Sequence, residues 1–307
     1  MLGRIVGPVR FKEPLSFHTP MHIGGPAEFF IEPRDLDDVR YALAFADQEG
    51  LPVTAIGGGN NLLVADRGFP GVVLKLQGVF ARTQFHGVEA LVGAGVNLGA
   101  FIREAAARGL GGLECFAGIP GTLGGALAMN VEVQEAALIG RCARIYFLHP
   151  DGTLGEIRMP AGVPAAGYTL PTGRLVLGCR IVLSRRPPAQ IKKEIHQRFK
   201  LKKAAEPLAL ASVGYVWRNP AGSETAAQLI ARVGLRGKRV NAVEISSKCA
   251  NFIVNRGDAT ASDVLALMEM THERVAAHAG VTLEAEIRTS GLDATPFQSR
   301  TLGLAPV

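Results

Sequence analysis

Apolar residues recur at helical spacing near the start of the chain, and a strand-like run follows them. Leu36, Val39 and Leu43 lie three or four residues apart, the pattern ends at Gly50, and residues 51–56 are mostly apolar. Residues at this spacing share one face of a helix, whereas a short apolar run between turn signals is typical of a buried strand. The pattern predicts a helix and then a strand that leads into a glycine turn.

The same two periodicities predict further elements along the chain. Strands are expected at residues 71–76, 90–93, 142–148, 154–158, 175–183 and 251–255, and helices at 98–108, 225–233 and 260–278. Gly109 and Gly280 follow two of these helices, as is common after a helix C-terminus, and Thr260 with Asp263 forms a capping box for the last one. Helices and strands in this mixture indicate an α+β fold.

The segment from Val281 to Arg288 alternates between apolar and polar residues. Leu283, Ala285 and Ile287 are expected to face a core, while Glu284 and Glu286 face the opposite side. Successive side chains of a strand point to opposite faces, so this pattern predicts one strand with both carboxylates on the same side.

Length and composition favour several domains in a cytoplasmic protein. The chain has 307 residues, of which 48% are apolar, which is enough to bury a cofactor between domains. No long uninterrupted apolar stretch predicts a membrane span, and Met1 to Lys12 lacks the apolar region of a secretory signal. A break at Arg185-Arg186-Pro187-Pro188 leads us to expect domains at 1–75, 76–190 and 191–307.

Cysteine spacing and charge limit the classes of ligand. The four cysteines are scattered without metal-ligand spacing, so we expect reduced, mostly buried thiols and no metal site. The net charge is +6, and the positive residues are densest between Arg185 and Lys203. That segment is interpreted as a solvated linker helix, with binding of a phosphorylated substrate left open. Because it has few aromatic residues, a nucleic-acid partner is not expected.

Two glycine-rich turns carry the strongest functional signal: the first at residues 56–64 and the second at residues 117–126. Glycine adopts positive φ and lets several backbone N–H groups converge on one anion, so the pair predicts a site for a large phosphate-bearing cofactor. For Thr122, a hydrogen bond to the diphosphate and a helix cap are both open. The predicted cofactor-binding residues are Gly57, Gly58, Gly59, Asn60, Asn61, Leu62, Gly118, Ile119, Pro120, Gly121, Thr122, Gly124, Gly125, Ala126 and Asn130.

The order of motifs resembles the family of flavin-dependent UDP-N-acetylenolpyruvoylglucosamine reductases of bacterial peptidoglycan synthesis, and it does so over nearly the whole chain. No single segment decides the resemblance, but their order and spacing are specific. The matching segments are 22–27, 57–64, 112–114, 118–126, 129–130, 219–220, 248–255 and 283–286.

The resemblance implies a fold, a cofactor and a reaction. It implies a two-part N-terminal FAD-binding region of the vanillyl-alcohol-oxidase type and a C-terminal α+β substrate-binding domain. NADPH is then the hydride donor and a UDP-sugar the substrate, with the flavin hydride delivered to C3 of an enolpyruvyl group. No histidine lies in the first glycine turn, which favours noncovalent FAD.

Carried over residue by residue, the family's catalytic pattern is partly altered. Glu286 matches the glutamate of the last strand, and Tyr168 matches a tyrosine that the family follows with arginine, where this chain has Thr169. Tyr215 stands at the position of the family's serine proton donor, where its hydroxyl either relays a proton or fills the site. Arg218 and Asn219 are the expected contacts to the sugar nucleotide.

Three functions follow from this interpretation. The first is an FAD- and NADPH-dependent reductase in peptidoglycan precursor synthesis. The second is a catalytically impaired relative that binds FAD or a UDP-sugar. The third is an oxidase or dehydrogenase that uses the same flavin module on another substrate, because a shared fold does not fix the chemistry.

Overall fold

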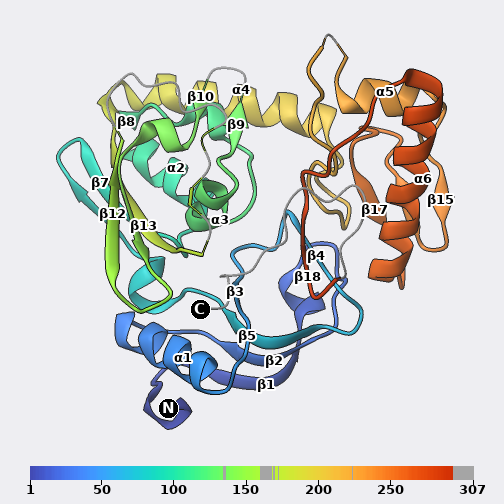
Figure 1. Cartoon of the computed structure of the whole chain (residues 1–307). Helices are drawn as coiled ribbons and strands as arrows, with labels where there is room; N and C mark the ends of the chain where they lie inside the picture. Colours follow the sequence, from blue (N-terminus) through green and yellow to red (C-terminus); the bar gives the residue numbers. More distant parts are fainter. Residues whose placement is uncertain (134–135, 160–167, 169, 172, 223, 293–307) are drawn as a thin grey trace.

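The computed structural model describes residues 1–133, 136–159, 168, 170–171, 173–222 and 224–292. Figure 1 shows three regions: the N-terminal residues form a sheet at the base, the middle of the chain lies at the upper left, and the C-terminal region lies at the upper right. A long helix, α4 (Pro188–Ala205), runs across the top of the view from the middle region toward the C-terminal one.

The first region is a four-stranded sheet with a helix on one face. Its strand order is β1-β2-β5-β3, with β1 antiparallel to β2 and the other pairs parallel. The side chain of Asp35 accepts a hydrogen bond from the N–H of Asp38 and caps the helix. The elements are β1 (Val9–Pro14), β2 (Pro26–Ile31), α1 (Leu36–Gln48), β3 (Val53–Ala55) and β5 (Phe69–Leu74). The loop after β3 is the first glycine turn.

The second region is a five-stranded antiparallel sheet covered by two helices. The strand order is β12-β11-β13-β7-β6, and β11 and β12, both predicted as strands, form a hairpin. The helices bury Leu98, Phe101 and Leu123 against this sheet. The elements are β6 (Thr83–His86), β7 (Glu89–Gly93), α2 (Leu98–Ala107), α3 (Leu123–Ala128), β11 (Cys142–Leu148), β12 (Leu154–Arg158) and β13 (Leu175–Val182). The second glycine turn leads into α3.

Short elements complete these two regions. Two-stranded ladders join β8 (Leu110–Gly111) to β14 (Ser184–Arg185) and β9 (Glu132–Val133) to β10 (Ala136–Ala137). Single-turn 3-10 helices lie at η1 (Leu2–Arg4), η2 (Leu15–His18), η3 (Gly78–Ala81), η4 (Glu114–Phe116) and η5 (Ile139–Arg141).

The third region packs two helices on a small antiparallel sheet. Its elements are α5 (Ala226–Arg232), β15 (Arg239–Val240), β16 (Val243–Ile245), β17 (Ile253–Asn255) and α6 (Ala261–Ala279). Its core also contains Met21, Ile23 and Leu63 from the first region, all buried. After α6 the chain returns as β18 (Arg288–Ser290), which pairs in parallel with β4 (Leu62–Val64) of the first region. The third region is therefore built partly on the first.

Most predicted elements are present, and one differs. The predicted capping box of Thr260 and the stop at Gly280, which has φ +66°, bound α6 as expected. The strand expected at 281–288 has the predicted burial alternation, but only β18 is a regular strand. Ahead of it, the segment meets residues 216–218 through one isolated bridge between Ala285 and Trp217. Among the described residues, the Arg218 N–H donates to the Glu284 carbonyl but the Glu284 N–H does not donate back to Arg218, so the ladder ends at this bridge.

The domain limits 1–75, 76–190 and 191–307 remain our proposal, with α4 as the element that joins the last two. Ile195 of α4 packs against the core of the second region, and Ile191 is buried next to Gly111 of β8. At the other end of the helix, the backbone carbonyl of Lys203 accepts a hydrogen bond from the side chain of Lys248 in the third region.

Candidate active site

The two glycine turns lie against each other. A Cβ built on Gly57 would stand 2.4 Å from the Thr122 hydroxyl oxygen, and one on Gly58 would stand 2.8 Å from Cα of Gly121. Gly121 has φ +108° and Gly118 has φ +86°, backbone conformations that residues with a Cβ rarely adopt. Glycine at these positions is thus required for the contact between the turns.

The turns carry backbone donors that the fold does not use. Among the described residues, the N–H groups of Gly58, Asn60 and Thr122 donate to no backbone carbonyl. The Thr122 hydroxyl accepts from the Gly125 N–H at 3.3 Å, so it caps α3. Because clustered amide donors suit an anion, the residues present fit the diphosphate of FAD.

Asn130 and Leu62 flank this pair of turns. Asn130 is buried with φ +40°, and its side-chain amide donates to the carboxylate of Glu132 at 3.2 Å. Leu62 is buried at the start of β4. The backbone N–H of Ile119 bonds within its own turn, to the carbonyl of Phe116.

Three hydrogen bonds join the first glycine turn to the C-terminal region. The Asn61 side chain donates to the backbone carbonyl of Glu286 at 3.1 Å. The Gly214 N–H donates to the carbonyl of Asn60 at 2.8 Å, and the Arg288 N–H donates to that of Asn61 at 3.0 Å. The predicted cofactor turn and the predicted catalytic glutamate, far apart in sequence, are therefore neighbours.

Glu286 and Arg218 form an ion pair beside this junction. Arg218 Nε lies 3.0 Å from a carboxylate oxygen of Glu286, and both side chains are about one-third exposed, at 39% and 31%. The two backbones are also tied together, since the Glu286 N–H donates to the carbonyl of Val216 and the Arg218 N–H to that of Glu284. A cation and a carboxylate are thus held in register at the edge of the site.

Buried Asn251 fixes the segment that carries Arg218 and Tyr215. Its side-chain oxygen accepts from the Trp217 N–H at 2.8 Å, and its amide donates to the Trp217 carbonyl at 2.7 Å. The Asn251 side chain thereby satisfies the backbone N–H and carbonyl of Trp217, as a neighbouring strand would do in a regular sheet.

Asn251→Ala is expected to lower the free energy of unfolding by about 2–4 kcal/mol, because two buried backbone groups of Trp217 lose their partners. Urea unfolding of the variant and the parent protein measures the difference. A loss below about 0.5 kcal/mol, which is usual for surface positions, would contradict this role.

The remaining predicted residues have diverse surroundings. The Asn219 side-chain oxygen accepts from the Ala226 N–H at 3.0 Å and so supports the start of α5. The Tyr215 hydroxyl donates to a carboxylate oxygen of Glu206 at 2.9 Å. Tyr168 is exposed, and Thr169 lies outside the described residues.

The cysteines are less buried than expected. None of the four forms a disulfide; Cys142 and Cys179 are buried, whereas Cys115 and Cys249 are only half-buried. Burial, and next a hydrogen bond with Cys142, raises the pKa of the Cys179 thiol, so it is an inert core residue.

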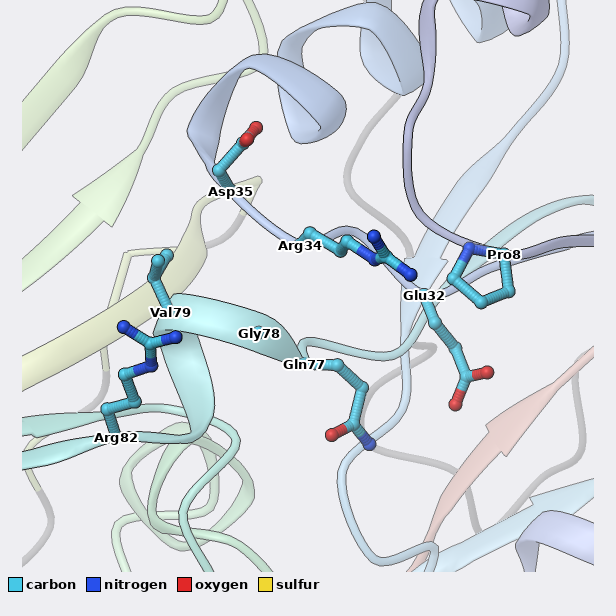
Figure 2. A pocket seen from close by; sticks show the side chains of 8 residues that line it. All are labelled: Pro8, Glu32, Arg34, Asp35, Gln77, Gly78, Val79 and Arg82. Atoms are coloured by element: carbon cyan, nitrogen blue, oxygen red, sulfur yellow. The ribbon is translucent and has the colours of Figure 1, made fainter.

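A separate cavity of about 450 Å³ lies between the first two regions (Figure 2). It is lined by Glu32 and Arg34 after β2 and by Gln77, Gly78 and Arg82 around η3, and it includes none of the predicted site residues. Among the described residues, no three His, Cys, Asp or Glu side chains gather as metal ligands. Within the same residues, no helix combines the length and apolar character needed to span a membrane.

Comparison with known proteins decides the family. Relatives named UDP-N-acetylenolpyruvoylglucosamine reductase, from Geobacter metallireducens, and UDP-N-acetylenolpyruvoylglucosamine reductase 2, from Symbiobacterium thermophilum, are 37% and 38% identical to this chain. Each alignment covers 93% of the chain, and it covers 95% of the first relative and 93% of the second. The chain belongs to the UDP-N-acetylenolpyruvoylglucosamine reductase family. The predicted membership is confirmed.

Domain models and a solved structure agree. A model described as an FAD binding domain matches residues 27–157, and one described as the C-terminal domain of UDP-N-acetylenolpyruvoylglucosamine reductase matches 206–290. The crystal structure of the reductase from Thermus caldophilus superposes with a TM-score of 0.77 at 30% identity, covering 92% of this chain and 98% of that one. The predicted α+β class, with an FAD-binding region before a separate C-terminal domain, is confirmed.

Sequence reasoning overlooked several residues that hold the site together. Glu206 and Lys202 meet Tyr215 from the end of α4, and the pairing of β18 with β4 brings Arg288 beside Asn61. The only sequence signal for Glu206 is a single carboxylate at the end of a basic helix, directly before Pro207.

Proposed function

We propose that this protein is a flavin-dependent oxidoreductase that reduces UDP-N-acetylenolpyruvoylglucosamine to UDP-N-acetylmuramate with NADPH. The names of the relatives and the match to an FAD-binding domain model support this proposal. The observation that carries it is the hydrogen bond from Asn61 of the first glycine turn to the backbone of Glu286, because it brings the cofactor turn to the predicted catalytic glutamate of the substrate domain.

The two glycine turns are the proposed FAD site. Their unused amides would hold the diphosphate noncovalently, and the capped start of α3 would fix the second turn in place. When bound, FAD supplies a carrier that takes a hydride from NADPH and passes it to the substrate's double bond.

Arg218 and Glu286 are the proposed groups for the reacting end of the substrate. Adding a hydride to the carbon β to a carboxylate builds negative charge on that carboxylate, which a guanidinium and a hydrogen-bond donor stabilise. Arg218 supplies the cation, and Glu286 holds its Nε at 3.0 Å. Tyr215 would stand at the α carbon that takes up the proton, while Asn219 and Tyr168 are proposed contacts at the edges of the substrate.

The cellular setting follows from these partners. NADPH and UDP-sugars are small molecules of the cytoplasm, so we propose a cytoplasmic enzyme that needs no metal. The basic α4 is proposed as a linker helix: its side chains are mostly exposed, and only Ile191 is buried.

An anaerobic two-step titration tests the function. Purified protein saturated with FAD is expected to lose its visible flavin absorbance when NADPH is added and to recover it when UDP-N-acetylenolpyruvoylglucosamine is added. The recovery should yield UDP-N-acetylmuramate, which mass spectrometry identifies.

Three results would contradict the proposal in different ways. If NADPH leaves the flavin oxidised while UDP-sugars still raise the melting temperature, the protein is a binding protein. If oxygen but not the sugar restores the absorbance, the protein is an oxidase for another substrate. If FAD does not bind, the assignment of the glycine turns is wrong.

A further inference from the structure

Tyr215 lies where every part of the candidate site meets. The residue before it, Gly214, donates its N–H to Asn60 of the first glycine turn, and the residue after it, Val216, accepts from the N–H of Glu286. Both hydrogen bonds measure 2.8 Å. Tyr215 is thus held between the cofactor turn and the predicted catalytic glutamate, and the residue remains 44% exposed.

The hydroxyl of Tyr215 ends a short chain of polar groups. It donates to Oε1 of Glu206 at 2.9 Å, and the ammonium group of Lys202 donates to the same oxygen at 2.6 Å. The Glu206 side chain is only 7% exposed, whereas that of Lys202 is 19% exposed. The chain therefore runs from a group that solvent reaches, through a buried carboxylate, to the phenol.

The same cluster borders the second glycine turn. Gly118 packs on α4, since a Cβ built there would lie 3.1 Å from the side chain of Lys202. On the other side, the Tyr215 ring packs edge-on against Phe252 with centroids 4.9 Å apart. Lys202, Glu206 and Tyr215 are therefore held in one arrangement by α4 and the third region.

This environment makes it costly for Tyr215 to lose its proton without receiving another. Burial, followed by the Glu206 carboxylate, raises the pKa of Tyr215 well above its usual value, and Cys249 adds to the rise. Losing the phenol proton by itself would leave a tyrosinate beside a carboxylate, which costs far more than the same loss from an exposed tyrosine.

We propose that Lys202 and Glu206 are positioning and proton-relay residues that let Tyr215 protonate the substrate. This inference rests on the proposed function, because the acceptor is the α carbon of the enolpyruvyl group. The Tyr215 hydroxyl first turns its hydrogen from Glu206 toward the substrate. As the new C–H bond forms, the Tyr215 O–H bond breaks. The phenol oxygen takes a proton from the Glu206 carboxyl, which has taken one from the Lys202 ammonium. Lys202 is left neutral and regains its proton from water.

The number of protons is conserved over these steps. One proton leaves Lys202, one reaches the substrate, and Glu206 and Tyr215 each end as they began. No tyrosinate accumulates, which is how a tyrosine can stand where the family is expected to have a serine.

A spectroscopic titration of flavin-free protein tests the contact between Glu206 and Tyr215 without any turnover. We expect the ultraviolet difference between parent protein and Tyr215→Phe to show no tyrosinate signal near pH 10, where ordinary tyrosines titrate. The same comparison is then made between Glu206→Gln and Glu206→Gln/Tyr215→Phe. There the tyrosinate signal of Tyr215 should appear at a pH about one unit or more below that in the parent background, because the adjacent negative charge is gone. A Tyr215 signal near pH 10 in the parent background would overturn the proposed arrangement.

Half-reaction kinetics test the relay itself. Glu206→Gln, Tyr215→Phe and Lys202→Met are each expected to slow reoxidation of the reduced flavin by the sugar about 100-fold, and to leave reduction by NADPH unchanged. The double variant Glu206→Gln/Tyr215→Phe should be no slower than the single ones, because both remove the same proton path. Lys200→Met, on the exposed side of the same helix, is the matched control and should react like the parent protein.

Solvent isotope effects separate a relay from a structural role. The reoxidation rate of the parent protein is measured in mixtures of light and heavy water and plotted against the fraction of heavy water. The plot should be curved, because more than one proton moves in the step. A straight line, or an equal loss of both half-reactions in Glu206→Gln, would overturn the relay. If the sugar fails to reoxidise even the parent protein, the proposed function itself is wrong; if it reoxidises the parent and the relay variants equally fast, only the relay is wrong.

Discussion

Gly58→Ala is expected to weaken FAD binding by about 10- to 100-fold. The added methyl group would stand 2.8 Å from Cα of Gly121 and 2.4 Å from the side-chain oxygen of Asn60. Backbone cannot yield as a flexible side chain does, so the two glycine turns must separate and their amides no longer converge. Overpacking of this kind costs about 1–3 kcal/mol, and each 1.4 kcal/mol is about tenfold in affinity. Calorimetric titration of flavin-free protein with FAD measures the effect.

Gly257→Ala is the matched control for this change. A Cβ on Gly257 meets nothing within 4 Å, and its φ is not positive, so FAD affinity should stay within about twofold of the parent. Thermal unfolding of both flavin-free variants checks that they fold. Parent-like FAD affinity in Gly58→Ala would show that the contact between the turns does not shape the cofactor site.

Glu286→Gln is expected to slow reoxidation of the flavin by the enolpyruvyl sugar about 100-fold or more. The substitution neutralises the carboxylate that holds Arg218 Nε at 3.0 Å, so the cation loses its fixed orientation toward the substrate. Removing one preorganised electrostatic partner of a developing charge typically costs about 100- to 1000-fold in rate. Stopped-flow absorbance of NADPH-reduced protein mixed anaerobically with the sugar measures it.

Reduction by NADPH should be unchanged in this variant, because it precedes contact with the sugar. Glu284→Gln provides the comparison: its side chain is exposed, and it lies two residues away on the same segment. That variant should reoxidise at the parent rate. An equal slowing by Glu284→Gln and Glu286→Gln would mean that charge on the segment, rather than the Arg218 pair, sets the rate.

Local patterns carried most of the prediction of the fold. The helix at 260–278 was predictable because its capping box and its stop at Gly280 depend only on residues within the helix and next to it. The hairpin of β11 and β12 was predictable for the same reason, since its turn lies between its strands. Strands β1 and β2 gave no comparable signal: β1 has no buried residue along its length, so its pattern lacks an apolar face.

The candidate site was predictable only where one motif sufficed. Both glycine turns can be recognised by their glycine content, and Glu286 was found through the family motif. What remained hidden were the pairs: Asn61 with the Glu286 backbone, Asn251 with Trp217, and Glu206 with Tyr215. In each pair the two residues do not belong to one helix or strand, so no helical or strand periodicity relates their positions.

The burial of Met21, Ile23 and Leu63 in the core of the third region has a consequence for how the chain folds. A fragment made of residues 206–292 alone would leave an apolar socket open where these three side chains sit, and its own helices would not close it. The socket must be filled by residues translated long before it, which makes these contacts of high sequence separation. The polypeptide is therefore expected to lose its first and third regions together when it unfolds, as one cooperative unit instead of two independent ones.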